Sequence, residues 1–543
     1  MKLSDYVTSY LEKITDSIFL VSGGGCMHMV DSIGRSNLKS YCCHHEQGCA
    51  LAAEGYARQK NDIGVISVTT GPGGTNAITG VASAWIDNIP MLVLSGQVRT
   101  EMMVQDEDKP YLRQIGPQEL NIVDIVKPIT KYAVLVKDPR EIKYHLEKAH
   151  YLAKSGKPGP VWLDLPLDIQ RAEIQEQNLV GFEAPKKQKT FIPLEEIVGA
   201  LNKSKKPLML VGQGVRLGNS IELLNEFIQK TGINVISAMS GDDLITEDYA
   251  NYLGRQGITG TATANYAVDN CDLLLILGTR MQTRQTSFDY QNFAKNAVKI
   301  MVDIDPAELS KKTLQLDIPV CADSRDFLEN ILKQDINLQR WNIERKADPY
   351  PKERNPGYVD VYRFVQELSG KCNYPIITTN GMACEANHQA IRLKKGQRLI
   401  TNTAFGEMGK GLPMAIGACV ANSGKPVICM EGDGSMMMNM QELQTMRYHN
   451  LPLKIFLFNN GGYFSIRNTH QNYFNKVFAA DETSGLSFPD WSKLAPAWGI
   501  KYESLRSEND LSKISGVLGY DGPVFCEVFI SPSQKMLPKW SAK

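Results

Sequence analysis

Two polar motifs in the last third of the chain could together hold a metal ion and a phosphorylated ligand. Gly432-Asp433-Gly434 follows one apolar run, and Asn459-Asn460 follows a second run, Leu453–Phe458. Carboxylate and amide oxygens suit a Mg²⁺ ion that bridges to phosphate, and glycines let backbone N–H groups approach an anion. A carbonyl in Gly461-Gly462 could complete the metal ligands. A lone GDG would be a common turn, but the two motifs at this spacing are more specific.

Two parallel strands must position these motifs. The carboxyl ends of parallel strands lie side by side, at the edge where open α/β sheets bind ligands. We expect Ser435 to cap a helix that ends near His449–Asn450. The positive end of that helix would favour the negative charge of a phosphate.

A second candidate site lies near the start of the chain. A strand-like stretch leads to Glu46, and Val65–Val68 leads to a Gly-rich turn at Gly71–Gly74. Glu46, Pro72 and Asn76 are therefore expected at neighbouring strand ends. On its own, Glu46 could be an acid that the dipole favours at a helix N-terminus.

Taken together, the motifs resemble the acetolactate synthase family of thiamine-diphosphate enzymes. The series HHEQ (44–47), EGYAR (54–58), TGPGGTN (70–76), DNIP (87–90) and SGQV (95–98) is similar to the family's pyrimidine-binding domain. GDG with the later NN is similar to its diphosphate signature. The likeness covers the first and last thirds of the chain well and the middle more weakly.

The resemblance assigns roles to individual residues. It implies thiamine diphosphate and Mg²⁺ as cofactors, with Asp433, the Asn460 side chain and the Gly462 carbonyl as metal ligands. The catalytic residues it implies are Glu46, Gln118 and Met408, and the cofactor-binding residues are Pro72, Asn76, Gly381, Gly406, Met408, Gly432, Gly434 and Ser435.

The chemistry gives Glu46 and Met408 distinct tasks. A carboxyl group bonded to N1′ of the aminopyrimidine stabilises an imino form, which can then take the weakly acidic C2 proton of the thiazolium. Met408, in Asn402–Leu412, stands where the family has an apolar wedge that bends the cofactor; the alternative is an ordinary core methionine. The cofactor supplies the electron sink, and the protein supplies position and dielectric.

Alternating apolar runs and helical patterns predict an α/β fold with three doubly wound parallel-sheet domains. Two polar stretches, 183–190 and 348–356, divide the chain into residues 1–182, 191–347 and 357–543. By the resemblance, these are the pyrimidine-binding, central and diphosphate-binding domains. The family also implies a homodimer or homotetramer whose sites lie between chains.

The central third gives no dinucleotide fingerprint. Gly212, Gly214 and Gly218 do not form G-x-G-x-x-G, because residue 217 is Leu. Acetolactate synthases carry FAD in this domain, but the acidic pair associated with the flavin is replaced here by Gln282 and Thr283. We expect a structural domain and leave FAD as the alternative.

The substrate pocket departs from acetolactate synthase itself. Pro117, Leu167, Ser465 and Thr469 stand where that enzyme has Phe, Lys, Met and Trp, whereas Gln118 matches. We expect a 2-oxo acid donor, pyruvate above all, and a carbonyl acceptor. One alternative is a carboligase that uses a sugar or aldehyde acceptor in polysaccharide biosynthesis, and another is a simple decarboxylase. The missing fingerprint argues against an oxidoreductase, and the intact Glu46, Asp433 and Asn460 argue against a non-catalytic relative.

Composition excludes several other classes. The 543 residues include 59 Lys+Arg and 59 Asp+Glu, a balance that gives no attraction to nucleic acid or anionic lipid. No apolar run reaches the ~18–20 residues of a membrane span, and residues 1–21 lack the pattern of a signal peptide. We therefore expect a cytoplasmic protein with reduced cysteines. Four adjacent residues, Cys42–His45, cannot converge on one ion, so we expect no zinc there.

Overall fold

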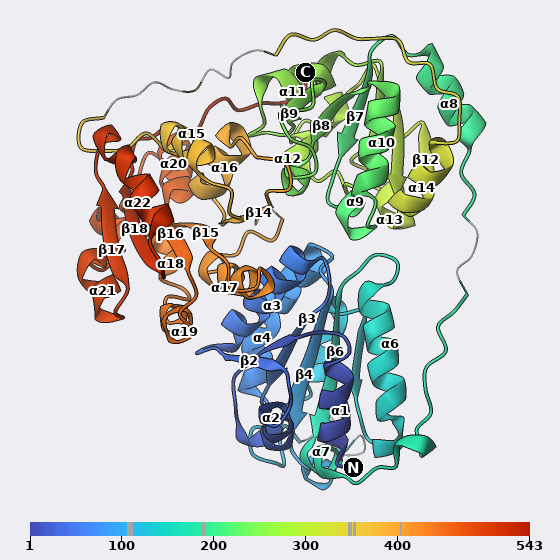
Figure 1. Cartoon of the computed structure of the whole chain (residues 1–543), viewed down its shortest axis with the longest axis vertical. Coiled ribbons are helices and arrows are strands. Elements are labelled where there is room, and N and C mark those ends of the chain that lie inside the picture. The colour runs from blue at the N-terminus through green and yellow to red at the C-terminus, as the bar shows by residue number, and fades with distance from the viewer. Residues whose placement is uncertain (106–111, 187–189, 346–349, 351–354, 402–403) are drawn as a thin grey trace.

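The computed structural model describes residues 1–105, 112–186, 190–345, 350, 355–401 and 404–543. Its strands form three sheets of six strands each, and every strand pair is parallel. Helices cover the faces of the sheets (Figure 1). The predicted α/β class with three parallel sheets is confirmed.

The first sheet has the order β2-β1-β3-β4-β6-β5, and its strands are β1 (Ser17–Leu20), β2 (Lys39–Cys42), β3 (Gly64–Val68), β4 (Met91–Gln97), β5 (Tyr132–Leu135) and β6 (Pro160–Pro166). The accompanying helices are α1 (Leu3–Leu11), α2 (Met27–Gly34), α3 (Glu46–Lys60), α4 (Pro72–Ile86), α5 (Ile122–Val126), α6 (Ile142–Lys154) and α7 (Leu167–Arg171).

The second sheet has the order β12-β11-β10-β7-β8-β9, and its strands are β7 (Pro207–Val211), β8 (Asn234–Ser237), β9 (Tyr252–Arg255), β10 (Leu273–Leu277), β11 (Val298–Asp303) and β12 (Ile318–Cys321). Its helices are α8 (Leu194–Lys203), α9 (Gly214–Leu217), α10 (Ile221–Thr231), α11 (Ala262–Asn270), α12 (Thr283–Thr286), α13 (Pro306–Leu309) and α14 (Ser324–Ile331).

The third sheet has the order β14-β13-β15-β16-β18-β17, and its strands are β13 (Ile376–Thr378), β14 (Leu399–Thr401), β15 (Val427–Gly432), β16 (Leu453–Asn459), β17 (Lys501–Leu505) and β18 (Val524–Phe529). Its helices are α15 (Val361–Lys371), α16 (Met382–Ala390), α17 (Gly411–Ala421), α18 (Asp433–Met436), α19 (Glu442–Tyr448), α20 (Phe464–Tyr473), α21 (Trp491–Ala497) and α22 (Ile514–Gly519).

Helices α3 and α17 join the first and third sheets at close range (Figure 1). A Cβ atom on Gly417 would lie 1.7 Å from the Ala52 carbonyl oxygen, and one on Gly55 would lie 2.0 Å from the Met414 carbonyl oxygen. Glycine at both positions therefore lets the two helix backbones touch. One hydrophobic core cluster runs through this contact into both domains.

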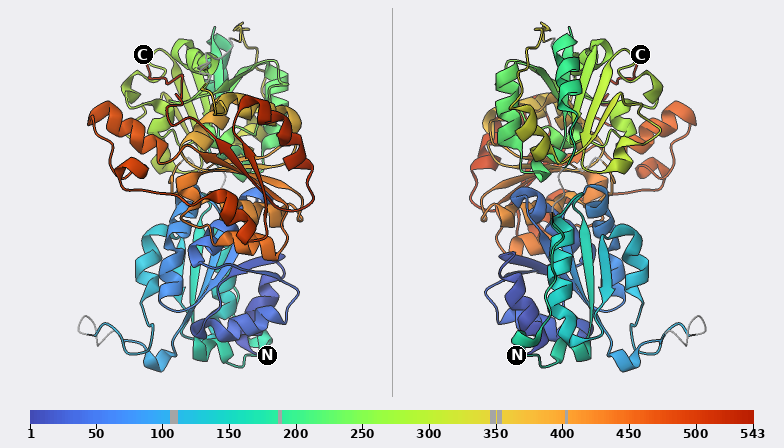
Figure 2. Two further views of the ribbon diagram at one scale, coloured as in Figure 1. Left: turned by 90° about the vertical axis from the view of Figure 1, so that its left-hand side faces the viewer. Right: turned by 90° about the vertical axis from the view of Figure 1, so that its right-hand side faces the viewer.

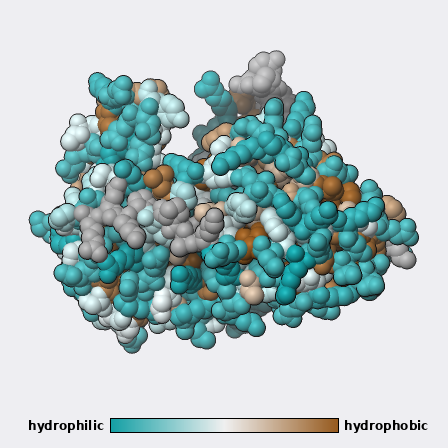
Figure 3. Space-filling view, turned by 90° about the horizontal axis from the view of Figure 1, so that it is seen from above, coloured by the Kyte–Doolittle hydropathy of each residue, from teal (hydrophilic) through white to brown (hydrophobic). Residues whose placement is uncertain are grey.

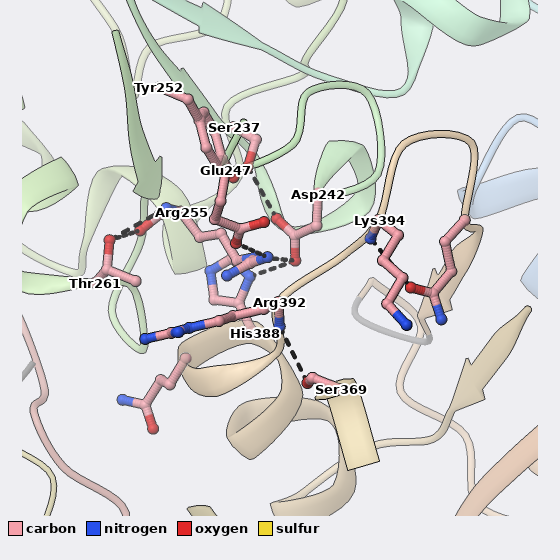
Figure 4. A network of polar contacts seen from close by, with 12 residues as sticks. Ser237, Asp242, Glu247, Tyr252, Arg255, Thr261, Ser369, His388, Arg392 and Lys394 are labelled. Carbon is pink, nitrogen blue, oxygen red and sulfur yellow. Dashed lines mark hydrogen bonds and ion pairs between the residues drawn. The ribbon is translucent and has the colours of Figure 1, made fainter. Parts of the chain in front are cut away.

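A buried polar network joins the second sheet to α16 of the third domain (Figure 4). Asp242 lies 2.7 Å from Nδ1 of His388 and accepts a hydrogen bond from Ser237. Arg255 pairs with Glu247 at 2.9 Å beside it. The first and second sheets lie at opposite ends of the molecule, with the third beside their junction (Figure 2).

The last residues return to the central domain. The Trp540 backbone N–H donates to the Ile258 carbonyl at 2.8 Å, and its indole donates to Asp269 at 3.1 Å. Seen from above, the molecular surface is largely hydrophilic (Figure 3). Among the described residues, no helix combines the length and apolar character needed to cross a membrane.

Candidate active site

The GDG and NN motifs meet at the carboxyl ends of β15 and β16. Gly432 pairs with Phe458 in the sheet, so the residues that follow each strand lie side by side. Asp433 begins α18 and is 1% exposed. Its Oδ2 accepts backbone N–H groups of Asn460 at 3.2 Å and Gly462 at 3.0 Å. The three residues expected to bind a metal are therefore brought together.

Arg467 on α20 orients the Asn460 side of this group. Its Nη2 donates to Oδ1 of Asn460 at 3.1 Å and to the Asn460 carbonyl at 3.0 Å. Our reading of the sequence missed Arg467. The sequence could have indicated it, because an arginine stands in the first turn of the helix that follows Asn459-Asn460.

The electrostatics of Asp433 suit a cation. Burial raises its pKa to about 6, although the surrounding backbone amides lower it. A divalent cation would favour the ionised carboxylate. A Cβ atom on Gly432 or Gly406 would meet no atom within 4 Å, so open space lies in front of both glycines. The hard oxygen donors and this space fit a metal-bound diphosphate.

Ser435 does not cap the following helix, so that prediction was wrong. The helix begins three residues earlier, at Asp433, because Gly432 is extended and takes the N-cap position. Two short helices, α18 and α19, replace the single helix that we expected. The Ser435 hydroxyl donates instead to Glu431 at 2.8 Å and accepts the Gly409 N–H at 2.8 Å.

Glu431 is a second residue that we missed. Burial raises its pKa to about 7, and it accepts the N–H groups of Gly411 and Leu412 at the start of α17. A charged residue inside the buried run of β15 was the signal that could have revealed it.

Met408 faces the GDG turn. Its Cε lies 3.5 Å from the position of a Cβ on Gly434, and the Tyr463 ring lies 2.2 Å from that position. Gly434 is therefore the residue that allows both side chains to approach. Met408 itself is half-buried. Asn402 and Thr403, the first residues of this segment, lie outside the described residues.

Gly381 and Gly406 border the same region. Asn380 donates from its side-chain amide to the Gly406 carbonyl at 2.9 Å. A Cβ on Gly381 would lie 3.5 Å from the Ser465 hydroxyl. Thr469 lies one turn farther along α20 and donates to the Ser465 carbonyl at 2.9 Å. Ser465 and Thr469 are both exposed.

The residues predicted around Glu46 also meet. Glu46 is the first residue of α3, 8% exposed, and its Oε2 accepts from the side-chain amide of Asn76 at 2.9 Å. Pro72 begins α4. A Cβ on Gly71 would lie 2.2 Å from the Gln118 carbonyl oxygen, so the Gln118 backbone lies against the start of α4.

The candidate residues thus form two clusters on different sheets. The Glu46 cluster, with Pro72, Asn76 and Gln118, lies at the ends of strands and helices of the first sheet. The Asp433 cluster lies at the carboxyl ends of the third sheet, with the loop that carries Met408.

A cleft with a volume of about 180 Å³ lies between the second sheet and the first domain, which contributes Arg58, Asp87 and Asn88 to its lining. It opens at the ends of β7, β10 and β11, and Gln282, Asp303 and Glu308 line it together with Arg280. Among the described residues, no group of three or more His, Cys, Asp and Glu is placed to hold a metal ion.

Each of the three domains matches a domain of a known protein family. Family models for the N-terminal thiamine-pyrophosphate-binding domain, the central domain and the C-terminal binding domain of thiamine pyrophosphate enzymes match residues 1–123, 194–331 and 379–528. The acetolactate synthase large subunit of Lactococcus lactis is 32% identical over 96% of this chain and 91% of its own length.

Two further relatives give the same result. The large subunit of acetolactate synthase isozyme 2 of Escherichia coli is 33% identical over 96% of this chain and 94% of its own. Chloroplastic acetolactate synthase 2 of tobacco, Nicotiana tabacum, is 33% identical over 99% of this chain and 83% of its own. The chain therefore belongs to the acetolactate synthase family of thiamine-diphosphate-dependent enzymes and is a carboligase of that family.

Proposed function

We propose that this enzyme decarboxylates a 2-oxo acid, pyruvate above all, and joins the remaining acyl unit to a carbonyl acceptor, with thiamine diphosphate and Mg²⁺ as cofactors. The observation that carries this proposal is the contact of Asp433 with the 460–462 turn, beside open space at Gly432. The proposed domains are residues 1–182, 191–347 and 357–543. FAD stays the alternative for the central domain; because the reaction transfers no electrons to a flavin, it would have no redox part in the chemistry.

The residues of the Asp433 cluster would bind and orient. Asp433, the Asn460 amide oxygen and the Gly462 carbonyl would hold Mg²⁺, and Gly381, Gly406, Gly432, Gly434 and Ser435 would surround the diphosphate half of the cofactor. Met408 would support the thiazolium ring from one side. When bound, thiamine diphosphate supplies a carbon nucleophile and an electron sink for cleavage of the bond beside the carbonyl.

The Glu46 cluster would handle protons. Glu46 would hold a proton against N1′ of the aminopyrimidine, and Asn76 would fix the carboxyl group by its 2.9 Å hydrogen bond. Pro72 would line the pyrimidine, and Gln118 would lie near the substrate. Because the two clusters occupy different sheets, we propose a homodimer, or a homotetramer built from two such dimers, in which each cluster completes a site with the other chain.

Polar residues on α20 support an acceptor that carries hydroxyl groups. The exposed Ser465 lies beside Gly381, and the exposed Thr469 follows one turn later on α20, where bulky apolar residues would favour a short alkyl chain. A site that hydrogen-bonds hydroxyls discriminates strongly against partners that lack them. We therefore favour a sugar or polyhydroxylated aldehyde, as polysaccharide biosynthesis would use.

Product analysis tests this proposal. The enzyme, with thiamine diphosphate and Mg²⁺, is incubated with pyruvate alone and with pyruvate plus glyceraldehyde, and CO₂ and products are measured. We expect slow acetolactate formation alone, faster CO₂ release with glyceraldehyde, and neither in Glu46→Gln. Acetolactate formed from pyruvate alone at ordinary enzymatic rates of ~1–10³ s⁻¹ would overturn the hydroxylated acceptor. Absence of CO₂ release under both conditions would overturn pyruvate as the donor.

A further inference from the structure

A fully buried lysine lies between the Met408 loop and the first domain. Lys410 has no solvent exposure. Its Nζ is 2.8 Å from Oε1 of Glu54 on α3 and 3.1 Å from Oε1 of Glu407, and it donates to the Ser83 hydroxyl at 2.6 Å. Burial lowers the pKa of Lys410, but Glu54 and Glu407 raise it above its ordinary value. The side chain is therefore a charged link between two domains.

Glu54 anchors this lysine to a larger network. Arg58 Nε donates to Oε1 of Glu54 at 2.8 Å, and the other end of Arg58 pairs with Asp87. Asp87 in turn lies 3.1 Å from Arg280 of the central domain. Charges of alternating sign thus form a continuous row through the three domains, in the order Glu407, Lys410, Glu54, Arg58, Asp87 and Arg280. Lys410 contacts a fixed carboxylate, since Glu54 is itself fully buried.

The other side of the Met408 loop is fixed within the third domain. Asn439 donates to the Gly409 carbonyl at 2.7 Å, and Ser435 accepts the Gly409 N–H at 2.8 Å. Glu431 accepts the Leu412 N–H at 2.9 Å. These contacts hold the loop to the diphosphate side of the site, whereas Lys410 is its charged tie to the first domain.

We propose that Lys410 is a positioning residue for the carboligation reaction, which sets the placement of Met408 through its ion pairs with Glu54 and Glu407. The proposal rests on the function proposed above. Lys410 is sealed from solvent and need not touch the substrate. Loss of its charge would leave the diphosphate contacts in place and disturb the support beneath the thiazolium ring.

The experiment compares Lys410→Met with a matched control, Lys454→Met. Lys454 is also fully buried in the third domain, but its ammonium group donates to the carbonyls of Tyr520 and Gly522. It is the second residue of β16 and therefore lies at the opposite end of the strand from Asn460. Both variants lose a buried ammonium group. The readouts are C2–H exchange of bound thiamine diphosphate, kcat, and the cofactor concentration that gives half-maximal activity.

We expect Lys410→Met to slow C2–H exchange and kcat by roughly 10–100-fold, the scale of a misplaced reacting group. The half-maximal cofactor concentration should stay within about threefold, because ground-state binding of the diphosphate is retained. Folded Lys454→Met should exchange as the wild type does. Wild-type exchange in Lys410→Met, or equal slowing in both variants, would overturn the proposal.

A double variant covers the case in which Lys410→Met does not fold. Lys410→Met with Glu54→Gln removes the buried ammonium group together with its nearest carboxylate, which is less damaging than removing the ammonium alone, and Arg58 keeps its ion pair with Asp87. We expect a folded protein with slow exchange; exchange at the wild-type rate would overturn the role of Lys410. If the wild-type enzyme itself shows no exchange and no reaction with pyruvate, the proposed function fails rather than the role of this lysine.

Discussion

The Asp433 carboxylate accepts hydrogen bonds from three backbone N–H groups, besides being the expected ligand of a cation. Two of these groups belong to the turn at Asn460 and Gly462, and the third belongs to Gly434 at 2.7 Å. The carboxylate therefore organises the turn that supplies the other expected metal ligands. Removing it should affect both the metal and the diphosphate.

We predict that Asp433→Ala weakens Mg²⁺-dependent binding of thiamine diphosphate by at least about 100-fold, because the diphosphate loses the cation that neutralises it. Isothermal titration calorimetry with and without Mg²⁺ measures this. Asp490→Ala, which removes an exposed cap of α21, is the control and should bind as the wild type does. Equal affinities of the two variants would contradict the metal assignment.

A second carboxyl group makes a pH-dependent contribution to stability. Burial raises the pKa of Asp164 to about 7, against hydrogen bonds from Ser95 and Gln97 that lower it. Because the folded-state pKa lies above the unfolded one, this contribution is fully present below about pH 4 and disappears as the pH rises through about 7.

We therefore predict that Asp164→Asn reduces the loss of unfolding free energy between pH 5 and pH 8 by about 2–4 kcal/mol, the size expected when a folded-state pKa is raised to about 7. Urea unfolding at both pH values measures the difference. The prediction fails if the variant loses as much stability between the two pH values as the wild type does.

For individual residues, the motifs supplied the candidates, and the structure brings the members of each motif pair close together. Asp433 lies at the end of β15 and Asn460 follows the adjacent β16, while Glu46 begins α3 and Asn76 lies near the start of the adjacent α4. Lys410 was not predicted, because its partner Glu54 is brought to it by the packing of a distant segment. Arg467 was not predicted either, although its partner Asn460 is only seven residues away in the sequence. No local pattern pairs Lys410 with Glu54.

At the scale of elements, the contact between α3 and α17 connects the two clusters. Glu46 begins α3, and the Met408 loop leads into α17, so the spacing of these helices sets where both groups lie. Gly55 and Gly417 allow that spacing. A side chain at either position would force the helix backbones apart.

We predict that Gly417→Ala destabilises the protein by about 1–3 kcal/mol or more, the usual cost of an overpacked core. Gly370→Ala on α15 is the matched control, because a Cβ there meets no atom within 4 Å and a helical alanine should gain up to about 1 kcal/mol. Thermal unfolding distinguishes them. Equal midpoints would show that the helices can separate without cost.

The apolar runs predicted the elements of the fold well. The runs Leu453–Phe458 and Val65–Val68 lie in β16 and β3, and both are buried because each strand is covered on both faces of a parallel sheet. The start of α18 was predicted wrongly, since Gly432 rather than Ser435 takes the N-cap position. Strand order came only from the structure, because crossovers leave no local pattern.

At the scale of the whole molecule, the placement of the two clusters on separate sheets makes a strong prediction about assembly. If each site takes Glu46 from one chain and Asp433 from the other, a mixed dimer of Glu46→Gln and Asp433→Ala chains contains one intact site. Co-expression should then restore about a quarter of wild-type activity, because half of randomly paired dimers are mixed.

Each variant expressed alone is the control and should be inactive. Size-exclusion chromatography with light scattering establishes that the mixed sample is dimeric or larger. If co-expression restores no activity although mixed dimers form, the site lies within a single chain.

The row of alternating charges from Glu407 to Arg280 also bears on how the protein melts. The cost of dehydrating ion pairs falls as temperature rises, whereas hydrophobic stabilisation per unit area levels off. The junctions between the sheets therefore weaken more slowly on heating than the apolar cores that they join. The three sheets should consequently melt together, as one calorimetric transition, rather than detach one after another.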